Sequence, residues 1–134
     1  MINQISKDIK FGNLMSSHAK ECLAYLINNI SNFKIVVNLK SVKFDPILPE
    51  KIMKNFNLPI IVFELGGYTL ETAKIQDDCL TFEAAFGEED FVSFLSIPYY
   101  CVLQILVDET PIFLNLATNN QSSKERSKRA FSLD

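Results

Sequence analysis

The sequence predicts one mainly β domain of the α+β class, with a single N-terminal helix. A helical pattern of apolar residues occurs only near the N-terminus, in residues 17–30. Six or seven short apolar stretches follow it, separated by Pro, Gly, Asn and Asp. A chain of 134 residues is long enough for one domain with its own core. Together these observations favour a helix on a small, strongly curved antiparallel sheet or partly open barrel.

The helix is expected between Ser17 and Ile30, where apolar residues recur at three- and four-residue spacing. Ser16 or Ser17 can cap its N-terminus, and the Asn-rich residues 28–32 can end it, because Asn and Ser side chains compete for backbone hydrogen bonds. Residues 1–16 lack clean periodicity and are expected to be a flexible lead-in. The apolar stripe consists of Ala19, Cys22, Leu23, Leu26, Ile27 and Ile30.

Short apolar stretches that alternate or run continuously are expected to form the strands. Pro46 and Pro49 interrupt the chain after the first of them, and Pro49 can open a short helix over residues 50–56, because a first-turn proline loses no hydrogen bond. Residues 99–107 fit a helical turn or a strand. The expected strands are residues 33–39 with an extension through Val42 and Phe44, then 60–65, 69–75, 79–86, 91–98 and 112–116.

Residues 80–98, with the sequence LTFEAAFGEEDFVSFLSIP, form the most informative stretch. Alternation places Phe82, Ala84 and Phe86 on one face, Gly87 opens an acidic loop, and a second apolar strand follows. This pattern is typical of an antiparallel hairpin with one buried face. The small Ala84 between two aromatic residues is expected to leave a shallow trough, where the backbone of a bound chain could approach.

The composition, 48% hydrophobic and 22% charged, is that of an ordinary globular domain. The formal net charge of −3 divides into −5 for residues 1–117, with 9 basic and 14 acidic side chains, and +2 for residues 118–134. An acidic body argues against a nucleic-acid surface, which needs clustered Lys and Arg. The last 17 residues contain few apolar side chains. We therefore expect a domain over residues 17–117, followed by a flexible basic tail.

Little catalytic or metal-binding chemistry is present. The three cysteines are widely spaced without a C-x-x-C pair, which fits a reducing cytoplasm better than disulfides or zinc. His18 is the only histidine, has no partner at ligand spacing, and is expected at the surface. The acidic loop 88–90 is too short for a calcium cage, and Gly66-Gly67 fits a bulge or a close approach by another chain better than a phosphate loop.

The sequence therefore predicts a protein that is not an enzyme and that has no metal or cofactor. Its N-terminus contains no long apolar run, so neither a signal peptide nor a membrane span is expected. One polar residue leaves two interpretations open. Glu64 interrupts the apolar run 60–65. Alternation can turn it to solvent or to a Lys partner, or it can lie at the rim of a groove and accept hydrogen bonds from a bound peptide.

Several segments, in order, resemble the SspB family of protease adaptors. The similarity runs from about Ala24 to Leu116, and its strongest part is the F-x-A-x-F-G string at residues 82–87. Each segment is short and degenerate alone, so the resemblance depends on their order and spacing. The other segments are FKIVVNLKSVKFDPILP (33–49), LPEKIMKNFNLPIIVFEL (48–65), LETAKIQDDCLTFEAAFG (70–87), FVSFLSIPYYCVLQI (91–105) and DETPIFLNL (108–116).

Members of that family are small cytoplasmic dimers that bind the ssrA degradation tag and deliver tagged proteins to the ClpX unfoldase of the ClpXP protease. The resemblance implies an N-terminal helix packed on a small Sm-like, partly open antiparallel β barrel. It further implies that the tag lies extended in an apolar groove, held by backbone hydrogen bonds and shallow pockets. The helix would contribute Leu23, Ile27 and Ile30 to the homodimer.

By position, the groove implied by the resemblance is lined by Val62, Glu64, Phe82, Ala84, Phe86, Gly87 and Ile97. Enlarging Ala84, as in Ala84→Gln, is expected to fill the trough and block the peptide. Phe82, Phe86 and Ile97 are equally compatible with a place in the hydrophobic core, without any role in binding.

This chain departs from the family pattern in two places. After Phe86-Gly87 it has Glu88-Glu89-Asp90, where the family commonly has a second glycine and then a proline. The family linker is often long and acidic, whereas here it is short and basic and ends in KRAFSLD. Because a flexible tether raises effective concentration, this end is the expected docking segment for ClpX. Its residues are Lys128, Arg129, Ala130 and Phe131.

Two other classes of binding protein remain open. A small acidic dimeric secretion chaperone, which binds an extended effector segment, has a similar size, but such chaperones usually close with an amphipathic C-terminal helix rather than a strand and a polar tail. An Sm-like RNA-binding module is disfavoured by the acidic body and by the lack of interleaved aromatic and basic residues.

Overall fold

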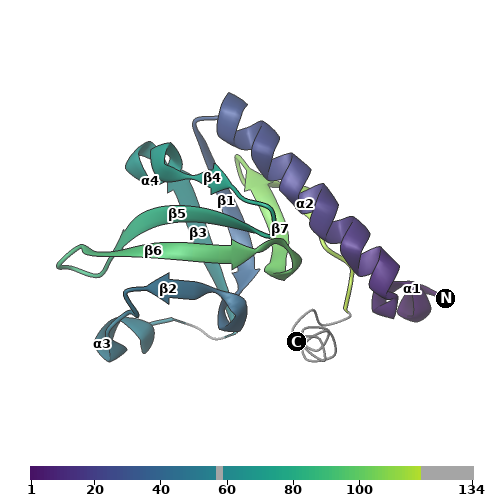
Figure 1. The fold of residues 1–134 in the computed structure, drawn as a ribbon, viewed down its shortest axis with the longest axis horizontal. Helices are drawn as coiled ribbons and strands as arrows, with labels where there is room; N and C mark the ends of the chain where they lie inside the picture. The colour runs from purple at the N-terminus through teal and green to yellow at the C-terminus, as the bar shows by residue number, and fades with distance from the viewer. Residues whose placement is uncertain (57–58, 119–134) are drawn as a thin grey trace.

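A long N-terminal helix and two four-stranded antiparallel sheets make up the computed structural model, which describes residues 1–56 and 59–118 (Figure 1). The expected α+β class is confirmed. The strands form two sheets that do not close into a barrel. The helix runs along one side of the sheets, and a long hairpin reaches toward the opposite side of the molecule (Figure 1).

The N-terminal region is helical from the start, so the expected flexible lead-in over residues 1–16 is wrong. Helix α1 (Ile2–Lys7) is followed by helix α2 (Ile9–Asn29). Asp8 caps α2, because its side chain accepts a hydrogen bond from the Lys10 backbone N–H at 3.2 Å. The expected cap at Ser16 or Ser17 is therefore also wrong. The first turns of α2 bury few side chains, which explains why their sequence shows no apolar period.

The predicted end of the helix is confirmed at Asn29. The amide groups of Asn28 and Asn29 donate hydrogen bonds to the Ala24 and Tyr25 carbonyl oxygens at 2.9 and 2.8 Å. These side chains satisfy carbonyl groups of the last turns, and the chain then enters the first strand.

The two sheets have the strand orders β3-β1-β7-β8 and β2-β6-β5-β4. The first sheet contains β1 (Asn32–Asn38), β3 (Ile60–Gly66), β7 (Val102–Val107) and β8 (Thr110–Leu114). The second sheet contains β2 (Lys43–Asp45), β4 (Lys74–Ile75), β5 (Cys79–Phe86) and β6 (Phe91–Pro98). The connections include η1 (Leu39–Ser41), α3 (Glu50–Met53), α4 (Gly67–Thr72) and η2 (Tyr99–Cys101).

Most predicted strands are confirmed within a residue or two, but one is wrong. The strand expected over residues 69–75 is mostly helix α4, and only Lys74–Ile75 pairs as a strand. Gly66 lies close to the Asn32 side chain, since a Cβ at this position would lie 2.5 Å from Asn32 Nδ2, and Gly67 starts α4 with a left-handed φ of +54°. The glycine pair therefore marks a close approach within the chain and the start of a helix, not a bulge.

The ambiguous segment 99–107 contains both alternatives, because η2 leads directly into β7. The last strand begins at Thr110, two residues before the expected Ile112. Pro111 is tolerated there because β8 is an edge strand, where one side of the backbone has no ladder to complete.

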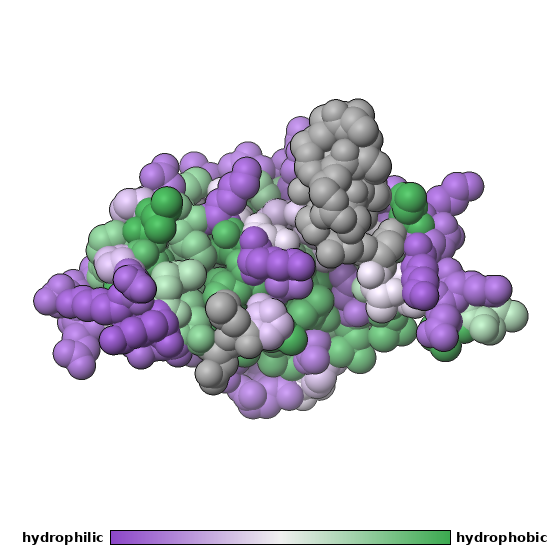
Figure 2. Space-filling model, turned by 90° about the horizontal axis from the view of Figure 1, so that it is seen from below, coloured by the Kyte–Doolittle hydropathy of each residue, from purple (hydrophilic) through white to green (hydrophobic). Residues whose placement is uncertain are grey.

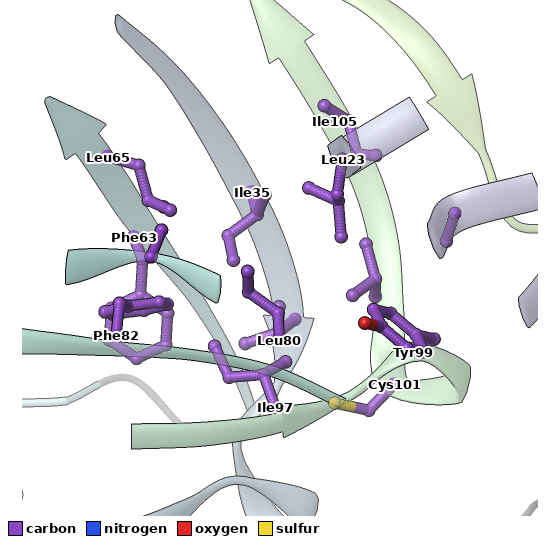
Figure 3. Packing of buried hydrophobic residues seen from close by; sticks show 14 of the residues in the cluster. Leu23, Ile35, Phe63, Leu65, Leu80, Phe82, Ile97, Tyr99, Cys101 and Ile105 are labelled. Carbon is purple, nitrogen blue, oxygen red and sulfur yellow. The ribbon is translucent and has the colours of Figure 1, made fainter. Parts of the chain in front are cut away.

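The hydrophobic core lies between the two sheets and under α2. Alternating residues of β1 point into it, as predicted, and α2 closes it with Leu23 and Leu26. Figure 3 shows Phe63 beside Phe82 at one end of this core and Tyr99 and Cys101 at the other. The side chains with no more than 1% exposure include Leu23, Phe33, Ile35, Val37, Leu65, Leu80, Phe82, Leu95, Ile97, Val102 and Ile105.

The helical stripe expected at a dimer contact is used within the chain. Leu23 is fully buried, and Ile27 and Ile30 are partly buried against the same core. An apolar stripe that covers the protomer's own sheets has little surface left for a partner. Leu23 therefore has no surface left for a partner, while the dimer contact of Ile27 and Ile30 and the oligomeric state remain predictions.

Candidate functional site

Strand β3 presents the longest open backbone edge in the part of the chain that the structure describes. It pairs with β1 in an unbroken register over all seven residues, and its other side has no strand neighbour among residues 1–56 and 59–118. In an antiparallel ladder every second residue directs its N–H and C=O away from the partner. Along β3 these groups form a row that can pair with another extended chain.

The other three edges are protected. Strand β2 has only three residues and is followed by Pro46, and strand β4 has only two residues. Strand β8 contains Pro111, and its register with β7 shifts between Ile105 and Leu106. Short strands, prolines and irregular pairing are the usual devices that prevent edge pairing. Strand β3 has none of these features. It is seven residues long, pairs with β1 in unbroken register, and its sequence IIVFELG contains neither Lys nor Pro.

Side chains of β3 alternate strictly between two faces. Phe63 and Leu65 point into the core with 6% and 0% exposure, whereas Val62 is 52% exposed on the outer face. Glu64 also lies on the outer face, where it accepts a hydrogen bond from Asn32 Nδ2 at 2.9 Å and lies opposite Lys34 in the ladder. This position agrees with the expectation that alternation turns Glu64 to solvent and toward a Lys, while its role at the rim of a peptide groove stays a prediction.

Phe63 packs against both aromatic residues that flank the trough expected at Ala84. The ring of Phe63 lies 5.9 Å from that of Phe82 (Figure 3) and 6.2 Å from that of Phe86. By alternation along β5, Phe82 and Phe86 flank Ala84 on the same face. Because β3 lies across this face, a guest backbone at Ala84 would have to share the space with Phe63, and its entry there stays a prediction.

A hollow of about 330 Å³ lies beside this aromatic group, between α3 and the tip of the β5–β6 hairpin. Phe86 connects the two features, because its ring contacts Phe63 at 6.2 Å and its side chain also lines the hollow. Phe56 completes the group at 6.2 Å from Phe86. The lining residues are Pro49, Lys51, Ile52, Asn55, Phe86, Gly87, Glu88, Glu89 and Phe91.

Gly87 allows the hairpin tip to sit against α3. Its φ of +78° is in the left-handed region, and a Cβ on this residue would lie 3.3 Å from Cδ1 and Cγ1 of Ile52. The acidic residues after it form a solvated turn, as predicted, in which Glu89 lies 3.8 Å from Lys51 of α3. Figure 2 shows the molecule from below, where patches of apolar surface lie between groups of hydrophilic side chains.

The predicted groove residues do not line one groove. Phe82 and Ile97 are fully buried between the sheets, so their alternative role in the core is the correct one. Val62 and Glu64 lie on the outer face of β3, and Ala84 and Phe86 lie half-buried on the inner face of β5. Gly87 lies at the exposed hairpin tip. The docking residues Lys128, Arg129, Ala130 and Phe131 lie outside the described residues.

Sequence reasoning missed Phe63, Ile52 and Phe56, which connect β3, α3 and the hairpin. Residues 60–65 were treated as one continuous apolar run that assigned no face to Phe63, and only the packing of the two sheets brings its ring against Phe82 and Phe86. The open edge did leave a signal, since residues 60–66 contain no charge guard except Glu64 and no proline.

The described part of the chain contains no group of three or more His, Cys, Asp or Glu residues that could hold a metal ion. His18 is exposed, as predicted, and packs edge-on against Phe113 at 5.2 Å. None of the helices in residues 1–56 and 59–118 is long and apolar enough to cross a membrane. Comparisons of the sequence with protein-family models and with curated proteins found no match.

Proposed function

We propose that this protein is a non-enzymatic adaptor that binds an extended peptide along the open edge of β3. The observation that carries the proposal is the contrast among the four sheet edges, of which only β3 is long, regular and unprotected. A peptide added there would continue the ladder β3-β1-β7-β8 as a fifth strand. Backbone hydrogen bonds then supply affinity, and alternate side chains supply specificity.

The surroundings of β3 offer contacts on both faces of such a peptide. On the outer face, Ile60 and Val62 are 47% and 52% exposed and present apolar surface beside the edge. On the inner side, the aromatic group around Phe86 leads to the hollow beneath the hairpin tip. Residues of the peptide that point outward would cover Val62, and those that point inward would approach Phe86.

The identity of the peptide follows from the resemblance of residues 24–116 to the SspB family. On that resemblance, we infer that the peptide is the ssrA degradation tag of stalled-translation products and that ClpX receives the cargo. The same resemblance supports a cytoplasmic homodimer, and it equates the two sheets with the family's Sm-like, partly open barrel. The basic end of the chain, Lys128 to Phe131, is then the segment that docks on the unfoldase.

The test is fluorescence anisotropy of a labelled ssrA-type peptide, with a scrambled peptide alongside. We expect saturable binding of the tag, and we expect Val62→Lys to weaken it about tenfold or more, because a charge on the outer face of β3 opposes apolar contact and edge pairing. Leu114→Lys is the matched control, since Leu114 is 53% exposed on the opposite edge strand of the same sheet. It should leave binding unchanged.

Two results would contradict the proposal. If both variants weaken binding equally, the peptide does not use β3. If the wild-type protein binds neither peptide, the tag-binding function is wrong, and the secretion-chaperone alternative should be tested with extended effector segments. A gel-filtration run on the same samples reports whether Val62→Lys instead disrupts a dimer that forms through this edge.

A further inference from the structure

A second hollow, of about 550 Å³, lies on the α2 side of the molecule and is not part of the β3 edge. Helix α2 forms one wall, and the turn between β4 and β5 forms another, together with the start of η2. The lining is mostly polar, in contrast to the aromatic group at β3. Its residues are Asn13, Ser16, Ser17, Lys20, Lys43, Asp77, Asp78, Cys79, Ser96, Pro98, Tyr99 and Tyr100.

The wall formed by α2 is a continuous polar stripe. Asn13, Ser16, Ser17 and Lys20 follow one another at spacings of three, one and three residues, which places them on one face of the helix. A polar helical face normally meets open solvent. Here it borders a concave space that other elements also line, so its amide, hydroxyl and ammonium groups converge on one volume.

Two lysines reach this space from different elements, Lys20 from α2 and Lys43 from β2. Neither ammonium group forms an ion pair with a carboxylate among residues 1–56 and 59–118. Lys20 makes only a long hydrogen bond, 3.4 Å, to the Asp77 backbone oxygen, and its Nζ lies 6.0 Å from the centre of the Tyr99 ring. Both positive charges are therefore available to an anion.

The tyrosine below Lys20 is fixed in place. The Tyr99 hydroxyl lies 2.6 Å from the Gln76 carbonyl oxygen and 2.9 Å from the Cys79 carbonyl oxygen, so it ties η2 to the β4–β5 turn. Burial is the main cause that raises the pKa of Tyr99 to about 12, and the hydroxyl stays a donor at neutral pH. The hollow is thus built on a rigid floor, and ligand sites are usually preformed in this way.

We propose that this hollow binds a small organic anion through a carboxylate or phosphate group contacted by Lys20 and Lys43. The hydroxyls of Ser16, Ser17 and Ser96 line the same space and can donate to that group. Asp77 and Asp78 border it and accept hydrogen bonds, which favours a ligand that also carries hydroxyl or amine groups. The mixed charge and limited volume fit a metabolite-sized molecule and not a nucleic-acid backbone.

The test is a titration of the full-length protein followed by NMR of ¹⁵N-labelled backbone amides, with glucose 6-phosphate, L-serine and inorganic phosphate as probes. Glucose 6-phosphate represents the phosphate source and L-serine the carboxylate source. We expect at least one of these two to produce saturable shifts at residues 13–20, 77–79 and 96–100, with tighter binding than inorganic phosphate. The residues of the β3 edge should not shift.

Lys43→Gln should weaken that binding about tenfold, because it removes a charged donor without removing volume. Lys40→Gln is the matched control, since Lys40 is an exposed lysine of η1 that does not line the hollow. Lys20→Gln gives a second variant, independent of β2. The proposal is overturned if neither organic probe saturates at about 10 mM, which corresponds to binding weaker than about 3 kcal/mol. It is also overturned if Lys43→Gln and Lys40→Gln bind alike.

Discussion

Strands β3 and β8 are the two edges of one sheet, yet they differ in almost every feature that controls edge pairing. Strand β3 has seven residues in unbroken register and no proline, whereas β8 has five residues, contains Pro111 and pairs irregularly. Each strand nevertheless directs one phenylalanine into the interior. Phe63 of β3 contacts the second sheet, and Phe113 of β8 contacts His18 of α2.

An edge strand has two separate properties, the burial of its inner face and the openness of its backbone edge, and a sequence pattern does not distinguish them. Both edges contribute a buried aromatic side chain, with 6% exposure for Phe63 and 3% for Phe113, so both are anchored to the domain. Only β3 leaves its backbone open to an incoming chain. The inner face of an edge strand thus serves stability, and its backbone edge serves pairing, so mutations at the two should have separable effects.

The largest effect is expected from removing the inner aromatic residue of β3. Phe63→Ala should lower the free energy of unfolding by about 3–5 kcal/mol, because it leaves a cavity next to Phe82 and Phe86 and deletes both ring contacts. Phe113→Ala is the matched variant on β8 and should cost somewhat less, because Phe113 has a single ring partner, the exposed His18. Urea denaturation of the two variants gives the comparison.

Binding measurements sharpen the distinction. Phe63→Leu keeps most of the buried volume, so the variant should fold. It should nevertheless bind the tag more weakly, because the ring contact that holds Phe86 beside β3 is lost. Phe113→Leu should bind as wild type does. If Phe113→Leu weakens the tag as much as Phe63→Leu does, the aromatic group at β3 has no specific part in the site.

An intermediate effect is expected at the hairpin tip, where Gly87 meets α3. Gly87→Ala should destabilise the protein by about 1–2 kcal/mol, because the residue has a positive φ and its Cβ would press on Ile52 at 3.3 Å. Gly67→Ala is the control, with a positive φ of +54° and no atom within 4 Å of the added Cβ. Gly67→Ala should destabilise the protein only through its unfavourable positive φ, so Gly87→Ala should unfold at the lower temperature.

The local sequence pattern was sufficient to predict much of the fold, because alternation of apolar residues and helix-ending residues are both features of short stretches of sequence. Alternation gave β1 and β5 their correct inner faces, and the Asn residues at the end of α2 correctly marked its last turn. The pattern failed where tertiary contacts decide. Residues 69–75 read as a half-polar strand, but Thr72 Oγ1 accepts a hydrogen bond from the Glu83 backbone N–H at 2.8 Å and holds α4 against β5.

The candidate site was less predictable than the fold, since its residues come from strands that meet only after the sheets pack. Val62 and Glu64 do lie on the exposed face of β3, whereas Phe82 and Ile97 were grouped with them although they belong to the interior. Alternation assigns a residue to one of two faces, but it does not say which face is covered. That information comes from how the two sheets are placed, and no local pattern contains it.

The smallest effect is expected from ionisation on the side of the molecule away from β3. Cys101 of η2 is 3% exposed, and burial is the main cause that raises its pKa from 9 to about 12. Between these values the unfolded chain releases the thiol proton and the folded chain keeps it, so the free energy of unfolding should fall as the pH rises above about 9. By pH 10 the loss should be about 1 kcal/mol.

Ionisation of Tyr99 also lowers the free energy of unfolding as the pH rises, because its pKa is raised from 10 to about 12. This contribution begins near pH 10, about one pH unit above that of Cys101. Cys101→Ala should therefore flatten the decline between pH 9 and pH 10 in urea unfolding experiments, while the decline that remains comes from Tyr99 and from the other groups with raised pKa values, Cys22, Cys79 and Tyr68. Cys22→Ala is the comparison: burial also raises the pKa of the half-buried Cys22, so this variant should flatten the decline in the same direction but less than Cys101→Ala does. An unchanged slope in Cys101→Ala would mean that the thiol ionises as readily in the folded protein as in the unfolded chain, and that α2 does not seal this side as tightly as the packing indicates.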